Sequence, residues 1–94
     1  MNNHIDYNNL AEFFKLFGHP IRLKVVLLLH QKKGELSVKE LISKTGVSLL
    51  TLSPHLARLR RLKVISGRRA DRQTHYKLNN RGDVSAILKV VQAF

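Results

Sequence analysis

The chain has 94 residues, of which 17 are lysine or arginine and 6 are aspartate or glutamate, so its formal net charge is +11. This length suits a single domain, 1–94, with one modest core, and the absence of cysteine excludes disulfides, thiolate metal sites and thiol redox chemistry. No apolar run approaches the roughly 18 residues of a membrane span, and the polar first residues do not resemble a signal peptide, so we expect a cytoplasmic protein that does not engage a membrane.

The first expected helix covers residues 8–17 and follows an N-terminal arm, 1–7. Asn8 or Asn9 can cap this helix, and Gly18 can end it. Its apolar positions are Leu10, Phe13, Phe14 and Phe17. Three phenylalanines within five residues are more than one terminal helix of a small domain can bury, which predicts burial against a second copy of the chain.

A second helix is expected from Pro20 to about Gln31, with Gly34 as its stop. Glu35 and Leu36 leave room only for a short edge strand. The third helix then begins at a capping box, in which a serine precedes a glutamate by three residues, and it ends near Lys44. The capping-box residues are Ser37 and Glu40.

A turn at 45–47 separates this third helix from a fourth, 48–62, which is the spacing of a helix-turn-helix. Ser48 is the expected N-cap. One face is an apolar stripe made of Leu52, Leu56, Leu59 and Leu62. The opposite face offers hydroxyls and cations, which suits a helix that lies in a DNA major groove: Thr51, Ser53, His55, Arg58 and Arg61.

Pro54 complicates this fourth helix, because proline has no amide hydrogen and costs about 3 kcal/mol inside a helix. Two arrangements fit the sequence. Either one helix runs from Ser48 through Pro54 with a local distortion, or Ser53 caps a helix whose first residue is Pro54. We prefer the continuous helix.

Residues 64–78 predict a basic β-hairpin. Residues 64–69 are extended, 70–73 can turn, and 74–78 alternate between apolar and polar. Arg72 lies near the tip, where it can reach a minor groove. Between residues 58 and 81 the sequence has one acid, Asp71, against nine basic residues, which favours a nucleic-acid partner over a merely solvated face. The nine are Arg58, Arg60, Arg61, Lys63, Arg68, Arg69, Arg72, Lys77 and Arg81.

Asp83 can cap a last helix that ends at 93.

Four segments together resemble the ArsR/SmtB family of small bacterial winged-helix repressors: GHPIRLKVVLLL, GELSVKELISKTGVS, TLSPHLARLRRLKVI and RRADRQTHYKL. The hairpin text is most similar to the family branch without metal sites, typified by HlyU and NolR. The resemblance implies a mainly α fold with a small β-hairpin, the winged helix-turn-helix, whose hairpin 64–78 is the wing. It also implies a homodimer that binds an inverted repeat in double-stranded DNA.

Two sets of residues are expected to carry these roles. The DNA-binding set comes from the helix 48–62 and the wing: Ser48, Thr51, Ser53, His55, Arg58, Arg61, Arg68, Arg69, Arg72 and Thr74. The dimerisation set comes from the first helix, 8–17, and the last, 83–93: Leu10, Phe13, Phe14, Phe17, Ile87, Leu88 and Val91.

The chain departs from the sensing sites of the family that it resembles. Ser37 and Lys39 stand where metal-sensing members have Cys-x-Cys. At the second family site Asp83 matches the first ligand, but Ser85 replaces the histidine, and the sequence ends at Phe94 before the later ligands. We therefore expect no metal and no cofactor, and the inducer or protein partner stays unidentified.

The fourth helix also departs from the family pattern, because Leu49, Leu50 and Pro54 replace residues that are usually polar. Leucine can contact a thymine methyl but cannot make the paired hydrogen bonds that discriminate bases. We therefore expect affinity that comes from phosphate contacts, with unusual or reduced base discrimination.

The five histidines are scattered in the sequence, which favours surface or capping roles over a zinc site: His4, His19, His30, His55 and His75. His55 has two interpretations, as a phosphate donor that gains affinity on protonation or as a packing residue. No nucleophile with a local base, no paired carboxylates and no phosphate-binding glycine loop are present, so we expect no enzyme.

Two functional classes follow from these features. The first is a homodimeric DNA-binding transcriptional regulator, a repressor, that reads its operator with 48–62 and the wing 64–78. The second is a winged-helix interaction module that pairs with another regulator and uses Leu49 and Leu50 as its contact surface.

Overall fold

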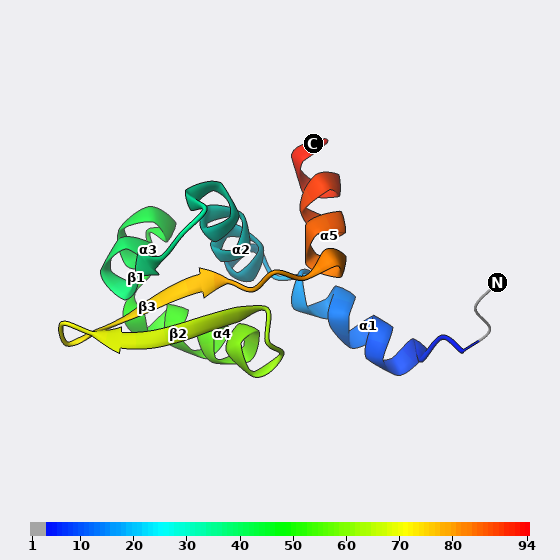
Figure 1. Cartoon of the computed structure of the whole chain (residues 1–94), viewed down its shortest axis with the longest axis horizontal. Coiled ribbons are helices and arrows are strands. Elements are labelled where there is room, and N and C mark those ends of the chain that lie inside the picture. Colours follow the sequence, from blue (N-terminus) through cyan, green and yellow to red (C-terminus); the bar gives the residue numbers. More distant parts are fainter. Residues whose placement is uncertain (1–3) are drawn as a thin grey trace.

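The computed structural model describes residues 4–94, in which five helices and three strands follow one another (Figure 1). The elements are α1 (Tyr7–Leu16), α2 (Pro20–Lys32), β1 (Leu36–Ser37), α3 (Val38–Thr45), α4 (Leu49–Arg61), β2 (Ile65–Ala70), β3 (Gln73–Leu78) and α5 (Gly82–Gln92). The predicted mainly helical fold with a β-hairpin is thus confirmed. The expected arm, 1–7, falls partly outside the described residues. None of the described helices combines the length and the apolar character that crossing a membrane requires.

The core forms where α4 packs against α2 and the sheet. It contains buried aliphatic side chains from both helices, among them Val25, Val26, Leu29, Leu52, Leu56 and Leu59. The three α4 leucines are those that the helical periodicity predicts. Leu62, expected to continue their stripe, is 38% exposed, because α4 ends at Arg61 and Lys63 turns the chain with a left-handed φ of 61°.

The three strands form one antiparallel sheet in the order β1-β3-β2. The hairpin of β2 and β3 is the predicted wing, and Asp71 and Arg72 form its two-residue turn. β1 pairs with the far side of β3, where Leu36 faces Tyr76. This pairing joins the middle of β3 to the helical body, while the tip of the wing extends beyond β1 (Figure 1).

Most helix boundaries follow the predicted capping signals. The capping box at α3 is confirmed, since the Glu40 amide donates to the Ser37 hydroxyl and the Ser37 amide donates to the Glu40 carboxylate, both at 3.1 Å. Pro20 is the first residue of α2, and the Nδ1 atom of His19 accepts a hydrogen bond from the Ile21 amide.

Three predicted helix ends were wrong. Asp6, rather than Asn8 or Asn9, caps α1, because its carboxylate accepts from the Asn9 amide at 3.2 Å. α2 ends at Lys32 with Lys33 in the left-handed region, one residue before the expected Gly34. Asp83 does not cap α5: it lies in the first turn, and its carboxylate accepts hydrogen bonds from Arg81. A carboxylate in that turn is favoured by the helix dipole.

The first and last helices both lie on the side of the molecule away from the wing tip, where the end of α1 comes near the start of α5 and the two helices then diverge (Figure 1). Of the seven predicted dimerisation residues, Phe17 and Leu88 are buried within this chain. Leu10 and Phe14 are exposed, and Phe14 is 54% exposed. The other three, Phe13, Ile87 and Val91, are half-buried. Val90, which was not in the predicted set, is exposed as well.

Gly67 lies opposite Tyr76 in the hairpin, and the tyrosine ring covers it. A Cβ atom added at Gly67 would lie 2.9 Å from the Cε1 atom of Tyr76 and 3.1 Å from the Cγ2 atom of Thr74. These contacts are too short for any side chain, so only glycine lets the ring pack onto the strand.

We expect Gly67→Ala to lower the free energy of unfolding by about 1–3 kcal/mol, the usual cost of overpacking a well-filled site. Urea denaturation at a fixed protein concentration measures this change. Gly82→Ala is the matched control: no atom lies within 4 Å of the added Cβ at this first residue of α5, so it should be neutral or slightly stabilising. Equal effects of the two substitutions would contradict the steric explanation.

Candidate nucleic-acid interface

The helix α4 is a single helix that contains Pro54. Ser48 is its N-cap, and the Ser48 hydroxyl accepts a hydrogen bond from the Thr51 amide at 3.3 Å. The continuous arrangement is therefore confirmed, and the alternative in which Ser53 caps a shorter helix is wrong. Because Pro54 has no amide hydrogen, it cannot donate to the carbonyl of Leu50, four residues earlier.

Two exposed ridges run along the outer side of α4, away from the buried leucines. Residues on each ridge follow the three- and four-residue spacing of one helix face. The first ridge consists of Leu50, Pro54, Ala57 and Arg61, and the second of Leu49, Ser53 and Arg60. Both ridges are apolar near the N-terminus of the helix and cationic near its C-terminus.

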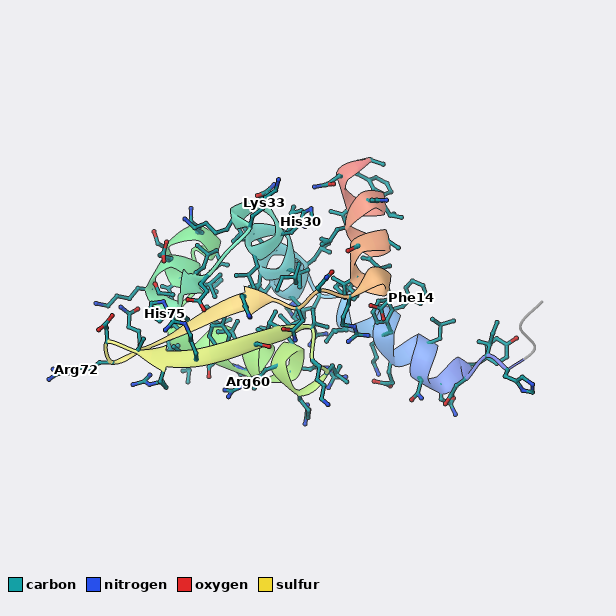
Figure 2. The ribbon with its side chains drawn as sticks, viewed as in Figure 1. Phe14, His30, Lys33, Arg60, Arg72 and His75 are labelled. Atoms are coloured by element: carbon teal, nitrogen blue, oxygen red, sulfur yellow. The ribbon has the colours of Figure 1, made fainter. Side chains whose placement is uncertain are left out.

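The wing continues this surface. A groove of about 470 Å³ lies between α3, α4 and the wing, and its lining includes Leu49, Ser53, Arg69 and Arg72. Arg72 projects from the hairpin tip, and Arg60 points away from the body on the α4 side (Figure 2). α4 and the wing therefore present one continuous face, with cations at the C-terminal end of α4 and at the wing tip.

Some predicted DNA-binding residues contact other parts of the chain instead. Arg58 turns toward α1, where it forms an ion pair with Glu12 at 3.3 Å. Arg68 pairs with Glu35 at 2.7 Å, and this hydrogen-bonded contact holds the pKa of the Glu35 carboxyl below its usual range. These two arginines are less available to phosphates than the sequence indicates.

The remaining predicted residues lie on or beside the continuous face. Ser53 and Arg61 are exposed on α4, and Thr51 is exposed beside its N-cap. In the wing, Arg69 and Arg72 are exposed, and Arg69 donates to the hydroxyl of Thr74 at 3.3 Å. Ser48 contributes its hydroxyl to the helix cap.

The sequence reasoning missed Arg60. This residue is exposed, follows Ser53 by seven residues and therefore shares its helix face. The spacing from Ser53 was the available signal, but the predicted cationic face included Arg58, which lies on the opposite side of α4 from Arg60 and turns toward α1.

His55 lies against the ring of His19, with 4.1 Å between the ring centroids. Burial, followed by the positive charges of His19 and Arg22, lowers the pKa of His55 below its ordinary value. The half-buried position corresponds to the packing interpretation of His55. The lowered pKa disfavours the protonated ring on which the phosphate interpretation depends.

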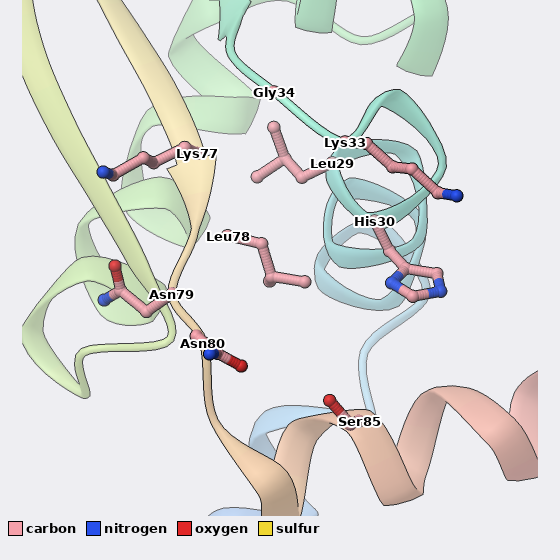
Figure 3. Close-up of a pocket in the computed structure, with 9 residues that line it drawn as sticks. All are labelled: Leu29, His30, Lys33, Gly34, Lys77, Leu78, Asn79, Asn80 and Ser85. Carbon is pink, nitrogen blue, oxygen red and sulfur yellow. The ribbon is translucent and has the colours of Figure 1, made fainter.

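A second cavity, of about 430 Å³, lies between the end of α2, the end of β3 and the start of α5 (Figure 3). Lys33 and Lys77 line it, but their ammonium groups lie on opposite sides and point away from each other (Figure 3). Two ammonium groups that point away from each other cannot bind the same anion. The cavity therefore gives no indication of an inducer. Among residues 4–94 no three His, Cys, Asp or Glu side chains are grouped so that they could hold a metal ion.

Comparison with known proteins matches residues 19–66 to the family described as "Bacterial regulatory protein, arsR family". The Biofilm growth-associated repressor of Xylella fastidiosa (strain Temecula1) is 38% identical over 71 residues. That match covers 76% of this chain and 60% of the repressor, so the chain spans less than two thirds of that relative's length.

Two solved structures show the same architecture. HlyU from Vibrio cholerae superposes with a TM-score of 0.80 at 28% identity, covering 95% of this chain and 96% of HlyU. The homodimeric winged helix-turn-helix DNA-binding domain of Mb0332 from Mycobacterium bovis gives a TM-score of 0.75 at 26% identity, covering 99% of this chain and 88% of that domain.

The lowered pKa of His55 predicts that the fold loses stability on acidification. The unfolded chain binds the proton first, at about pH 6.5, whereas the folded chain resists it. Stability is therefore full above that pH and falls as the pH decreases toward the folded pKa. Urea denaturation between about pH 7.5 and 5.5 should show this loss, and His55→Gln should reduce it. His30→Gln, outside the stacked pair, is the control, and an identical pH slope in both variants would contradict the assignment.

Proposed function

Because the chain belongs to the bacterial arsR family of regulatory proteins, we propose that it represses transcription as a homodimer bound to double-stranded DNA. The family consists of regulators, so the chain is not an enzyme, and the resemblance seen in the sequence is confirmed. The likeness to HlyU agrees with the branch predicted from the hairpin text.

One observation carries this proposal: the face formed by α4 and the wing has four exposed arginines, none of which forms an ion pair within residues 4–94. These are Arg60, Arg61, Arg69 and Arg72. Lysines and arginines that neutralise phosphates release counterions and supply most of the sequence-independent affinity for DNA. A surface of this charge, centred on an exposed helix, fits the major groove of a duplex.

The arrangement also suggests how the duplex is engaged. α4 enters the major groove with its N-terminal residues toward the base edges, and Arg60 and Arg61 reach the phosphates at its C-terminal end. Arg72, at the tip of the wing, reaches the adjacent minor groove. In a two-fold symmetric dimer the operator is an inverted repeat whose half-sites are about 10 base pairs apart.

Apolar side chains on α1 and α5 support the dimer. Leu10 and Phe14 are exposed on α1, and Val90 is exposed on α5, and exposed apolar side chains of this kind gain from burial against a partner. The Mb0332 domain, which has the same architecture, is homodimeric. We propose that the dimer contact is formed by Leu10, Phe13, Phe14, Ile87, Val90 and Val91, whereas Phe17 and Leu88 stabilise the protomer.

We also propose that the protein acts without the metal and cysteine redox sites of the family. Ser37, which stands at one of the expected thiolate positions, contributes its hydroxyl to the cap of α3. Asp83, the one residue that matches the second metal site, accepts hydrogen bonds from Arg81. The local roles of both side chains therefore support a different signal.

An interaction module remains the second candidate function, and Leu50 is the observation that favours it. This side chain is 87% exposed at the start of α4. A repressor should prefer its own operator over random duplexes at physiological salt, whereas an interaction module should show only salt-sensitive background binding.

Arg61→Ala should weaken binding to every DNA sequence, because the side chain would contact phosphate rather than bases. The slope of log affinity against log salt should decrease by about 1 for each lost phosphate contact, hence by about 2 in a dimer. Fluorescence anisotropy over a salt series measures this slope. Arg68→Ala is the control, since Arg68 is held by Glu35, and a loss as large as that of Arg61→Ala would show that the ion pair does not determine availability.

Arg72→Ala should reduce affinity more for operators with A·T-rich flanks than for operators with G·C-rich flanks. Narrow A·T minor grooves have the deeper negative potential, which favours an inserted arginine. Affinities of wild type and variant for one operator core with exchanged flanks provide the measurement. An equal loss on both flanks would refute a minor-groove position for Arg72.

A further inference from the structure

The part of α4 that would face the base edges is apolar. Recognition helices contact bases mainly with their N-terminal residues, and at this end of α4 the exposed side chains include Leu49 and Leu50, which are 52% and 87% exposed. Pro54 follows Leu50 by one turn on the same ridge, and Ala57 follows Pro54. The position that usually carries hydrogen-bonding groups therefore carries hydrocarbon.

The polar groups at this end of the helix are partly engaged. The Ser48 hydroxyl accepts from the Thr51 amide and lies 3.3 Å from the Thr51 hydroxyl, with which it forms a second hydrogen bond. Pro54 has no amide hydrogen to offer. Hydrogen bonding to base edges is thus left mainly to the hydroxyls of Ser53 and Thr51, so another kind of contact has to supply most of the sequence discrimination.

The charges around this apolar surface favour DNA as its occupant. Arg61 lies on the same ridge as Leu50, Arg60 lies on the neighbouring ridge, and Arg72 is at the wing tip. An apolar protein partner would have to desolvate or avoid these cations, whereas a duplex places phosphates on both sides of the groove that the helix enters. The exposed apolar feature of a major groove is the C5-methyl group of thymine.

We propose that α4 selects its operator by the methyl groups of thymine, which Leu50 and Pro54 contact in each half-site. This inference depends on the proposed function and extends it, because it names the base and the chemical group that are recognised. Discrimination then comes from burying methyl groups rather than from paired hydrogen bonds. The expectation of weak base discrimination is replaced by a specific preference for thymine under the N-terminal half of α4.

The test exchanges thymine for uracil, which removes only the C5-methyl group and leaves the hydrogen-bonding pattern of the base pair unchanged. The purified full chain first enriches duplexes from a random pool. The enriched duplex is then synthesised with deoxyuridine in place of thymidine within the half-sites, and fluorescence anisotropy gives both affinities. Wild type should bind the uracil duplex about fourfold more weakly for each contacted methyl, the factor for burying one methyl-sized group.

Two variants locate the effect. Leu50→Ala should lose most of the difference between the thymine and uracil duplexes. Because Leu50 is 87% exposed, the variant should keep its fold, which circular dichroism checks. Arg61→Ala should weaken binding to both duplexes by the same factor and keep their difference. Uracil placed only outside the half-sites should leave the affinity of wild type unchanged.

The outcomes separate this inference from the proposed function. Equal affinity of wild type for the two duplexes would overturn the inference and leave the repressor intact. A difference that persists in Leu50→Ala would overturn the assignment to Leu50. If no sequence is enriched and binding is only salt-sensitive background, both proposals fail, and Leu50 is better explained as a contact for another protein.

Discussion

The burial of three leucines on one side of α4 is the constraint on which the rest of the interface depends. Leu52, Leu56 and Leu59 are all at most 2% exposed and pack into the core with α2. Because side chains on a helix have fixed angular positions, this burial fixes the rotation of α4 about its own axis. Arg60 and Arg61 must then face away from the body, while His55 and Arg58 must face the neighbouring helices. No separate interaction is needed to orient the exposed face of α4.

Acidic residues decide which cations of this strongly basic chain remain available. Glu12 and Glu35 each pair with an arginine that belongs to α4 or the wing, and Asp83 pairs with Arg81 in the loop before α5. Exposed pairs of this kind contribute little stability, because water screens them and ordering two long side chains costs entropy. Their larger effect is on the distribution of charge, since four of the five arginines that form no ion pair within residues 4–94 lie on the face formed by α4 and the wing. The fifth, Arg22, donates to the backbone carbonyls of Lys15 and Leu16.

Local signals predicted much of the fold, and long-range contacts account for what they missed. The capping box at Ser37, the continuous helix through Pro54 and the turn at Arg72 are each encoded within a few residues, and each was confirmed. Arg58 and Arg68 were placed on the DNA side, but their partners Glu12 and Glu35 lie 46 and 33 residues away in sequence. No spacing rule relates such residues. Arg60 was missed because the predicted cationic face of α4 included Arg58, which turns toward α1, and not the exposed Arg60. The DNA and dimer contacts themselves stay predictions.

The backbone of the turn at the wing tip lowers the stability of the fold, although its side chains are those proposed to bind DNA. Arg72 adopts a φ of 63°, and Asp71 before it a φ of 53°. A left-handed backbone costs a residue with a Cβ about 1–2 kcal/mol, which glycine avoids. A glycine at this position would therefore make the fold more stable, but it would remove the guanidinium group from the tip of the wing. With arginine at this position the hairpin is held in a conformation that its tip residue disfavours, and in the proposed complex the contact of Arg72 with DNA offsets that cost.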